Sequence, residues 1–429
     1  MKYTPIKSQL FTRNRQNFSK LLKKNSLAIF NSNDEFPRSG DQTYPFKQNS
    51  DLFYLSGIDQ EQTILILYPD CPNPLYTEVL FLRQTDDHIA IWEGHKYTKK
   101  DASHASGISS VYWIDQFWNI LSSIIHYSDT IYLNTNENDR YIHSVPYKDL
   151  RFIKEIKERY PLHHYERSAR ILRDLRAVKS DIEIELTKKA SAITRDAFLR
   201  VLKFVKPGVK EYEIEAEIIH EFIRQSATGH AYNPIIASGA NANVLHYNDN
   251  NQVCKDGDVI LFDFGAEYGN YNADMSRSIP VNGKFTKRQK DVYNAVLRVM
   301  NEAKKMLIKG ADWNKYQEDV GKIMERELIG LRLLDKHDVS KQNPKMPLYK
   351  KYFMHGTSHH LGIDVHDFAS RYKPFEAGNI LTCEPGIYIP EEKLGIRLEN
   401  NILITEKGNI DLMADIPIEA DEIEDIMNS

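Results

Sequence analysis

Short apolar runs alternate with amphipathic segments over about the first 170 residues. Three runs have strand length and β-branched or aromatic character: ILILYP at 64–69, VLFLR at 79–83 and TIYLN at 130–134. Apolar residues at helical spacing predict helices at 117–127 and 151–160, the second ending before Pro161. This alternation predicts an α/β domain, and its sequence contains no recognisable catalytic cluster.

A domain boundary is predicted inside the segment RDLRAVKS at 173–180. Ser180 is a good helix N-cap, and Glu183 three residues later completes a capping-box pattern. Apolar residues at helical spacing follow and stop at Pro207-Gly208, which predicts one long helix. We therefore expect an N-terminal domain over residues 1–174 and a second domain over residues 175–429.

The second half begins with helices and then becomes rich in strands. A further helix is expected around 214–222, and PIIASG, VILFDFG and SRSIPV follow Gly229 as strands. Two more helices are predicted at 286–308 and 313–331, before the strands of ILTCEPGIYI and GIRLENNILIT. Helices on one side of a mostly antiparallel sheet would make this an α+β domain.

Length and composition are typical of a two-domain globular protein. A chain of 429 residues exceeds the size at which one hydrophobic core usually stops growing, and its 41% apolar and 27% charged residues are ordinary. The net charge of −4 and the lack of a basic stripe argue against nucleic acid as a partner. Cys71, Cys254 and Cys383 form no CxxC pair, so each is expected as a small buried hydrophobe rather than part of a disulfide framework.

The sequence has no segment typical of membrane insertion or export. The N-terminal residues MKYTPIKSQLFTRNRQNF are basic but lack an apolar core of signal-peptide length behind them. The longest apolar runs are far shorter than the ~20 residues that a spanning helix needs. We therefore expect a soluble cytoplasmic protein with no membrane partner.

Two acids are predicted to oppose each other in the segment VILFDFGAEYGNYNADMSRSIPV. If its turn is centred on Tyr268 and Gly269, Asp263 faces Asp274 across an antiparallel pair. Directly opposed Cβ atoms lie ~4.5–5.5 Å apart, and like charges there destabilise the pair. Such an arrangement requires a cation or a shared proton.

A second hairpin near the C-terminus opposes another pair of acids. ILTCEPGIYIP and KLGIRLENN flank a turn at 391–392, and this register pairs Glu384 with Glu399. Pro385 and Pro390 weaken the prediction, because proline cannot donate to a ladder. A proton-sharing carboxylate dyad is the rival chemistry, but it leaves one pair unexplained. Hard divalent cations with oxygen ligands account for both pairs.

The segment HGTSHHLGIDVHD supplies candidate nitrogen ligands. His355, His359 and His366 are three of the fifteen histidines in the chain, within twelve residues. The zinc motif HExxH is absent because Gly356 stands in the place of the glutamate. Four carboxylates with one histidine suit two Mn²⁺ or Co²⁺ ions bridged by a carboxylate better than a structural zinc site.

Two further residues complete the candidate site. Arg397 lies two residues before Glu399, so a strand would point both side chains to one face, where the arginine could orient the ligand. His246 follows a loop rich in glycine and asparagine and is the fourth candidate histidine.

These motifs resemble a known family. The segments NVLHY, DFGAEYGNYNADMSRSIPVNGKFT, HGTSHHLGIDVHD, TCEPGIYI and GIRLENN are similar to the pita-bread metallopeptidases, which include methionine aminopeptidase, prolidase and aminopeptidase P. With the N-terminal segment RSGDQTYPFKQNSDLFYLSGID, the chain most resembles aminopeptidase P over almost its entire length. The resemblance implies a pita-bread catalytic domain behind an α/β N-terminal domain.

The resemblance implies a role for each candidate. Asp263 would chelate one metal and His359 and Glu384 the other, with Asp274 and Glu399 bridging the two. The nucleophile would be a hydroxide, available at neutral pH because metals lower the pKa of water. The other implied functional residues are His246 and His366, which would support the tetrahedral intermediate, His355, which would line the pocket, and Tyr388 and Arg397, which would assist substrate or orient ligands.

The implied activity is release of the first residue from peptides with proline second. An X–Pro bond is a tertiary amide without an N–H, so enzymes that anchor that donor bind it poorly. The resemblance also implies two divalent metal ions, with Mn²⁺ preferred and Co²⁺ or Zn²⁺ as alternatives, and a homodimer or homotetramer. Three alternatives remain: a prolidase restricted to Xaa-Pro dipeptides, an inactive peptide-binding module, and a creatinase-like amidinohydrolase. Relatives without catalysis lose metal ligands, whereas all five candidates stand in this chain.

Two positions leave the pocket less certain than the metal ligands. His360 stands where a tryptophan is common in bacterial relatives, and the loop between Glu384 and Glu399 is short. Trp92 in IWEGH resembles a residue that edges the pocket in the family, with packing in the core of the N-terminal domain as an equal alternative.

Overall fold

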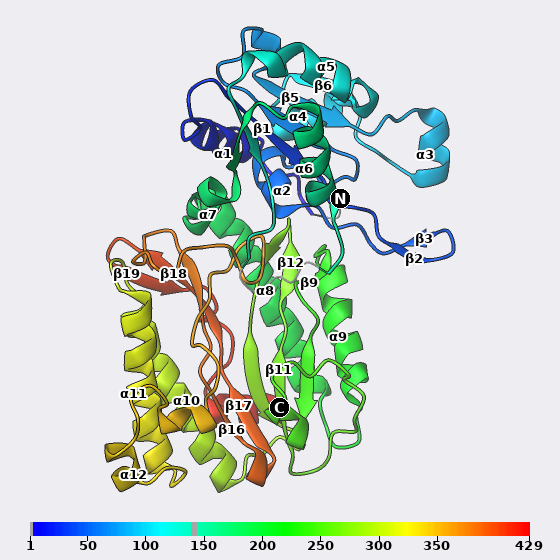
Figure 1. Cartoon of the computed structure of the whole chain (residues 1–429). Helices are drawn as coiled ribbons and strands as arrows, with labels where there is room; N and C mark the ends of the chain where they lie inside the picture. Colours follow the sequence, from blue (N-terminus) through cyan, green and yellow to red (C-terminus); the bar gives the residue numbers. More distant parts are fainter. Residues whose placement is uncertain (1–2, 139–143) are drawn as a thin grey trace. The chain divides into compact units, whose positions relative to one another are not determined.

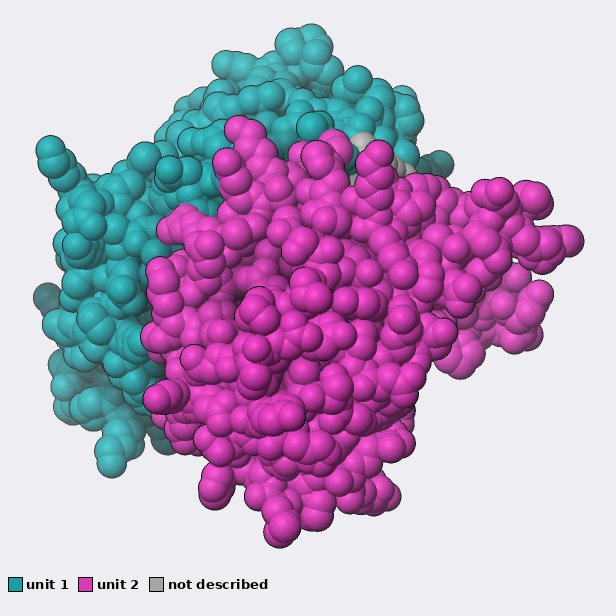
Figure 2. Space-filling view, turned by 90° about the horizontal axis from the view of Figure 1, so that it is seen from above, with its two compact units in different colours: residues 1–4, 176–429 teal, residues 5–175 magenta. Residues whose placement is uncertain are grey.

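The computed structural model describes residues 3–138 and 144–429 (Figure 1). Residues 5–175 form one compact unit, and residues 176–429 form the other together with Tyr3 and Thr4 (Figure 2). Within the described part of the chain, no helix combines the length and the apolar character that crossing a membrane requires.

The unit of residues 5–175 is built on a six-stranded mixed sheet. Its strands are β1 (Ser26–Asn31), β4 (Ile64–Leu67), β5 (Glu78–Leu82), β6 (Ser110–Trp113), β7 (Thr130–Leu133) and β8 (His164–Arg167). They lie in the order β6-β5-β4-β1-β7-β8. The pairs β5-β4 and β4-β1 are antiparallel, and the pairs β6-β5, β1-β7 and β7-β8 are parallel. A separate hairpin pairs β2 (Pro37–Ser39) with β3 (Gln42–Thr43).

Helices surround this sheet in the same unit (Figure 1). They are α1 (Gln9–Ser19), α2 (Ser50–Ser56), α3 (Asp87–Glu93), α4 (Lys99–Ser106), α5 (Phe117–Ile124) and α6 (Lys148–Arg159), with α7 (Ala169–Ala177) spanning the boundary between the units. The strands and helices predicted for this half are confirmed, and every residue of β4 is buried, as its unbroken apolar run indicates. Trp92 on α3 is 78% exposed, so of its two alternatives packing in the domain core is wrong, and a place at the edge of the pocket stays a prediction.

The second unit contains two helix pairs. α8 (Asp181–Phe204) packs against α9 (Glu211–Arg224), and α10 (Lys287–Met306) packs against α11 (Trp313–Gly330). The predicted capping box is present, because the Glu183 carboxylate accepts from the Ser180 N–H at 2.8 Å and from its hydroxyl at 2.7 Å. Two short helices, α12 (Lys336–Ser340) and α13 (Ala420–Met427), complete the set in the described residues.

The strands of this unit form small antiparallel sheets. They are β9 (Gly229–His230), β10 (Ile235–Ser238), β11 (Val259–Asp263), β12 (Ala266–Tyr268), β13 (Tyr271–Asn272), β14 (Ser276–Pro280), β15 (Ile380–Cys383), β16 (Gly386–Ile389), β17 (Leu394–Arg397), β18 (Asn400–Thr405) and β19 (Gly408–Asp411). The sheets are β10-β11-β14, β13-β12-β9, β15-β18-β19 and β16-β17.

Each helix pair contacts its own group of strands, and in Figure 1 the strands lie between the two pairs. α8 and α9 contact β9, β10, β12 and β13, whereas α10 contacts β15, β16, β17 and β19. β10, β15, β16 and β17 are buried along their whole length. Strands buried on both faces need apolar cover on both faces.

The register of the first hairpin differs from the prediction. Its turn is Gly269-Asn270, with φ of 59° and 64°, and Tyr268 pairs with Tyr271. A two-residue turn with both residues left-handed suits a twisted hairpin and favours glycine and asparagine. Further along, Asp263 is opposite Ser276, so the predicted pairing of Asp263 with Asp274 is wrong.

The register of the second hairpin is confirmed. Cys383 pairs with Asn400 and Gly386 pairs with Arg397, and both pairs belong to the predicted alignment. Glu384 and Glu399 lie in the short gap between these two ladders. Pro385 fits in the gap because its carbonyl accepts the N–H of Leu398 at 3.3 Å, so no donor is required of the proline.

Candidate metal centre

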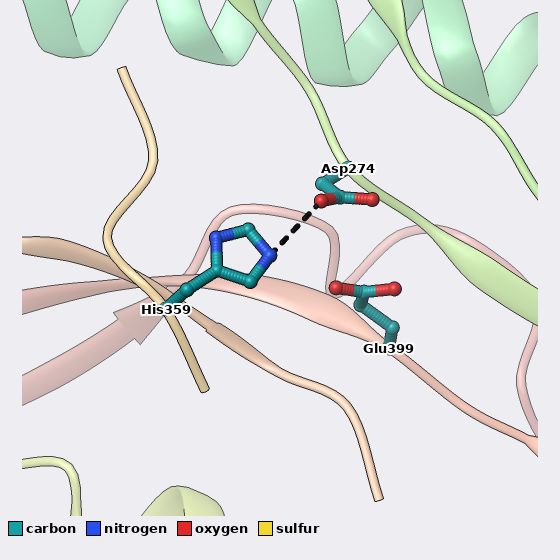
Figure 3. Close-up of side chains that lie close together, drawn as sticks. All are labelled: Asp274, His359 and Glu399. Carbon is teal, nitrogen blue, oxygen red and sulfur yellow. Dashed lines mark ion pairs between the residues drawn. The ribbon is translucent and has the colours of Figure 1, made fainter. Parts of the chain in front are cut away.

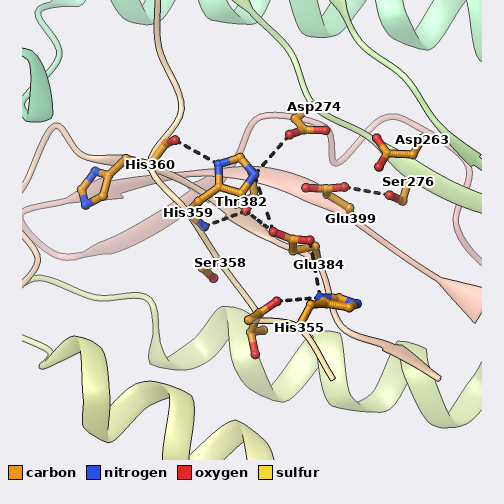
Figure 4. Close-up of polar contacts among 12 residues, drawn as sticks. Asp263, Asp274, Ser276, His355, Ser358, His359, His360, Thr382, Glu384 and Glu399 are labelled. Atoms are coloured by element: carbon orange, nitrogen blue, oxygen red, sulfur yellow. Dashed lines mark hydrogen bonds and ion pairs between the residues drawn. The ribbon is translucent and has the colours of Figure 1, made fainter. Parts of the chain in front are cut away.

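Four acids and a histidine from separate elements meet among the strands of the second unit (Figure 4). Asp263 ends β11, Asp274 precedes β14, Glu384 follows β15 and Glu399 precedes β18. His359 lies on the segment before β15. Single ligand atoms of Asp274, His359 and Glu399 all lie within 4.8 Å of one another (Figure 3).

His359 is oriented to present one ring nitrogen to the acids. Its Nε2 lies 3.3 Å from Asp274 Oδ2 and 3.5 Å from Glu384 Oε1. Its Nδ1 lies 3.0 Å from the carbonyl oxygen of His360, so this nitrogen carries the hydrogen and donates (Figure 4). A backbone partner for the second nitrogen is the usual way in which a metal-ligating histidine is held.

Burial and the charges of neighbouring acids raise the pKa values of Asp263, Glu384 and Glu399 when no cation is present. Burial raises the pKa of Glu384 to about 7, and the charges of Asp274 and Asp263 add to the effect against His359 and Arg397. Burial and the same neighbouring acids raise the pKa of Glu399 well above its usual value. Burial lowers the pKa of His359, but Asp274 and Glu384 outweigh it and raise the pKa to about 9.

One buried oxygen of the site has no partner among the described residues. Glu399 is 2% exposed; its Oε2 accepts from the Ser276 hydroxyl at 2.8 Å, while its Oε1 accepts nothing. A buried carboxylate oxygen without a partner is costly, and a cation would satisfy it. Together with the oxygen-rich donor set, this orphan atom shows that the residues fit hard divalent cations.

Tyr232 joins the two acids of the first hairpin. Its hydroxyl lies 2.5 Å from Asp274 Oδ1 and also contacts Asp263 Oδ1. A phenol has one hydrogen, so it can donate to only one of these carboxylates at a time. Tyr232 is not among the predicted site residues, because it lies outside both predicted hairpins and no sequence motif marks it.

Arg397 holds three side chains at the edge of the acid cluster. Its Nη2 donates to Asp263 Oδ2 at 2.5 Å, its Nη1 to the Tyr388 hydroxyl at 2.9 Å and its Nε to Ser276 Oγ at 2.8 Å. Ser276 in turn donates to Glu399. A guanidinium suits this task because its donors form a rigid planar fork.

His355 continues the chain of hydrogen bonds from Arg397. The Tyr388 hydroxyl accepts from Arg397 and donates to His355 Nε2 at 2.8 Å, and His355 Nδ1 donates to the Gly356 carbonyl at 2.8 Å. Burial and the charge of Arg397 lower the pKa of His355 to about 4. The ring is therefore neutral at neutral pH. His355 Nδ1 lies 3.7 Å from Glu384 Oε2.

The remaining two predicted histidines stand around this group. The ring of His366 meets the ring of His359 edge-on, with centroids 4.5 Å apart. His246 is exposed, and it lies near enough to His355 to contribute to the lowered pKa of that ring. All ten predicted site residues thus lie in or beside one cluster.

Polar residues outside the predicted set support the ligands. The side-chain oxygen of Asn401 accepts the backbone N–H of Asp274. Thr382 Oγ1 donates to Glu384 Oε1 at 3.3 Å. Ser276 is the ladder partner of Asp263, so a correct register for the first hairpin would have found it. Asn401 and Thr382 are ladder partners of each other in the second hairpin, one pair beyond Cys383 and Asn400.

Two family models match this chain in different parts. The family model described as Metallopeptidase family M24 matches residues 185–406, and that of the Aminopeptidase P, N-terminal domain matches residues 11–132. The chain is 34% identical to the Xaa-Pro aminopeptidase of Escherichia coli over 98% of both chains. It is 32% identical to the Xaa-Pro aminopeptidase of Haemophilus influenzae, over 98% of this chain and 97% of that one.

Solved structures show the same fold over the whole chain. Aminopeptidase P from Escherichia coli with the inhibitor Pro-Leu superimposes with a TM-score of 0.88 at 31% identity, covering 99% of each chain. The aminopeptidase PepP of Pseudomonas aeruginosa gives a TM-score of 0.89 at 29% identity, covering 100% of this chain and 99% of that one. The expected pita-bread catalytic domain and aminopeptidase P N-terminal domain are confirmed. The chain belongs to metallopeptidase family M24, in its aminopeptidase P branch.

Proposed function

We propose that this chain is a two-metal aminopeptidase that releases the N-terminal residue from peptides with proline in second position. One observation carries the proposal: Nε2 of His359 and the carboxylates of Asp274 and Glu384 converge beside Glu399, whose buried Oε1 has no partner among the described residues. The relatives named Xaa-Pro aminopeptidase, matched over nearly their full length, supply the substrate class.

Five residues would hold the two cations. Asp263 would bind one ion, His359 and Glu384 the other, and Asp274 and Glu399 would bridge them. Hydrogen bonds that orient the proposed ligands support these roles. The groups that make them are Tyr232, Arg397, Ser276, Thr382 and the His360 carbonyl. When bound, two divalent cations would polarise the peptide carbonyl and lower the pKa of water to make a nucleophile at neutral pH.

The residues of this chain around the ions would orient the substrate. The hydrogen-bonded series from Arg397 through Tyr388 fixes the ring of His355, and burial and the charge of Arg397 lower its pKa so that the ring is neutral. His366, packed edge-on against His359, and His246, on the exposed loop beside His355, would donate hydrogen bonds to the oxygen that becomes negative during attack.

The finer parts of the proposal concern the metal, the assembly and the domains. The oxygen-rich donor set supports Mn²⁺, with Co²⁺ or Zn²⁺ as alternatives. A homodimer or homotetramer and a cytoplasmic location follow from the family resemblance and the sequence. We also propose that residues 1–174 and 175–429 are two separately folding domains, and the two compact units support this division.

A substrate panel tests the activity and its main rival together. The purified chain with Mn²⁺ is incubated with Arg-Pro-Pro, with the dipeptide Arg-Pro, and with Arg-Ala-Pro as the control that lacks proline in second position. We expect release of arginine from Arg-Pro-Pro and none from Arg-Ala-Pro. Cleavage confined to Arg-Pro would favour a prolidase, and no release from any Xaa-Pro peptide would refute both.

Metal analysis separates the catalytic proposal from an inactive binding module. Asp274→Ala removes a proposed bridge, so metal content by mass spectrometry should fall well below that of the wild type. Asp411→Ala is the control: this acid lies in the same unit but contacts Asn400 and Lys304 rather than the ligands. Equal metal content in wild type and Asp274→Ala would contradict the ligand assignment.

A further inference from the structure

A second buried carboxylate, outside the metal ligands, ties together the loop that carries His246. Glu211, the first residue of α9, is 0% exposed. Its Oε1 accepts from the Ser238 N–H at 2.8 Å and from the Ser238 hydroxyl at 2.6 Å. Its Oε2 accepts from the Tyr247 hydroxyl at 2.8 Å and from the Gln252 N–H at 2.9 Å.

The partners of Glu211 mark three points along one loop. Ser238 ends β10, where the loop begins, Gln252 closes the loop, and Tyr247 lies between them, directly after His246. The N–H of Glu211 itself donates to the Gln252 carbonyl at 3.0 Å. One side chain therefore fixes the start, the middle and the end of the segment 239–251.

The environment of Tyr247 links this loop to the candidate active site. Tyr247 is buried in a small apolar cluster with Ala242 and with Tyr388, the tyrosine that contacts His355 and Arg397. His246 is exposed while Tyr247 is buried, so the two neighbouring side chains point in different directions. A fixed Tyr247 ring thus sets the direction in which the His246 imidazole is presented.

A buried carboxylate at this position is poorly explained by stability alone. Four donors and the N-terminus of α9 compensate its charge, but an apolar side chain of similar volume would avoid the cost of burying that charge. Hydrogen bonds have directions that apolar contacts lack, and they define one loop conformation. A loop that must present a side chain within a fraction of an ångström of a reacting group needs such definition.

We propose that Glu211 is a positioning residue for catalysis, which holds His246 toward the metal site by fixing Tyr247 and both ends of its loop. The proposal rests on the proposed function, because it takes His246 as a residue that contacts the substrate. Glu211 itself contacts neither the substrate nor the ligands; it acts through the loop.

Glu211→Gln is the informative variant because it changes hydrogen bonding and not shape. An amide nitrogen presents hydrogens where the carboxylate presents lone pairs, so one of the two sets of donors loses its acceptor. Tyr247→Phe removes only the middle contact. Glu183→Gln is the matched control, since Glu183 is also a buried acid at a helix start that accepts from a serine and from a tyrosine, Tyr271.

The test is a double-mutant cycle with His246→Ala, measured on Arg-Pro-Pro with Mn²⁺. We expect Glu211→Gln and Tyr247→Phe each to lower kcat about tenfold with metal content unchanged, and to lower it less than about twofold further once His246 is alanine. In the double variant of Glu183→Gln with His246→Ala, the fold-changes in kcat of the two single variants should multiply. Full multiplication for Glu211→Gln, or full activity of His246→Ala, would overturn the proposal.

A measurement on the metal-free chain keeps this proposal separate from the proposed function. Backbone amide hydrogen exchange in segment 239–252 should quicken at least about tenfold in Glu211→Gln and stay unchanged in Glu183→Gln. A wild-type chain without Xaa-Pro activity would refute the function, and the exchange rates would still decide whether Glu211 orders the loop. Unchanged exchange in Glu211→Gln would overturn the positioning role.

Discussion

Asn401 holds the backbone of Asp274 from both sides. Its side-chain oxygen accepts the Asp274 N–H at 3.1 Å, and its amide nitrogen donates to the Asp274 carbonyl at 2.7 Å. Asn401 is fully buried on β18, so the second hairpin fixes an acid that belongs to the first. The two hairpins are thereby locked in the alignment that brings their acids together.

Asn401→Ala should loosen this alignment. The change leaves two buried backbone groups of Asp274 without partners, so the free energy of unfolding should fall by about 2–4 kcal/mol. Affinity for Mn²⁺ should fall about 10- to 100-fold, because Asp274 loses its support. Urea unfolding and calorimetric metal titration measure the two effects, and wild-type metal affinity in a folded variant would contradict this role.

Arg397→Lys should separate charge from geometry. Lysine keeps the positive charge beside Asp263 but cannot bind Asp263, Tyr388 and Ser276 in the same planar arrangement. We expect metal content near that of the wild type and a fall in kcat of about 10- to 100-fold.

The control for that change is Arg298→Lys, in an exposed ion pair with Glu327 that contributes little. Its kcat and metal content should equal those of the wild type. If Arg397→Lys also kept full kcat, the guanidinium geometry would have no part in orienting the site.

Metal binding should release protons, and its affinity should rise with pH. The raised pKa values of about 7 for Glu384 and about 9 for His359 mean that the metal-free chain holds protons that bound ligands must lose. Folding depends on pH in the opposite sense: the contribution of Glu384 to the stability of the metal-free chain is full below its ordinary pKa of 4.5 and is lost as pH rises through about 7.

Calorimetry in buffers of different ionisation enthalpy counts these protons. At a pH of about 6, Glu384→Gln should release about one proton fewer than the wild type, because its amide does not titrate. An apparent Mn²⁺ affinity that is flat from pH 5 to about pH 9 would contradict the assignment of these two groups as ligands.

His360→Phe should stabilise the chain. The His360 ring stacks on Trp313 with centroids 6.0 Å apart, and its buried Nδ1 has no hydrogen-bond partner among the described residues. Phenylalanine keeps the stacking and removes the unsatisfied atom, which should add about 1 kcal/mol to the free energy of unfolding. Trp313→Leu, which removes the stacking instead, should destabilise. A lower urea midpoint for His360→Phe would show that Nδ1 has a partner in solution.

Most of the helices and strands, and all the proposed ligands, could be predicted because each leaves a local signal. The capping box of Ser180 and Glu183 marks α8, and the turn at 391–392 sets a register that the ladders on both sides of Glu384 share. The predicted register of the first hairpin is wrong because it centres the turn one residue early, whereas the left-handed turn residues are Gly269 and Asn270.

The supporting residues could not be predicted, because their partners are distant in sequence. The hydroxyl of Tyr232 contacts acids on β11 and before β14, and Asn401 contacts Asp274 from another sheet. Glu211, at the start of a helix, accepts hydrogen bonds from a distant loop. None of these contacts follows from periodicity or spacing. Each depends on how the two hairpins and helix pairs pack, which local sequence does not encode.

Titration of the metal-free chain with Mn²⁺, followed by release of arginine from Arg-Pro-Pro, tests whether this chain is a two-metal aminopeptidase. We expect no release without metal and activity that rises to a plateau at two Mn²⁺ per chain. Full activity without metal, or two bound Mn²⁺ per chain with no release from any Xaa-Pro peptide, would contradict this expectation.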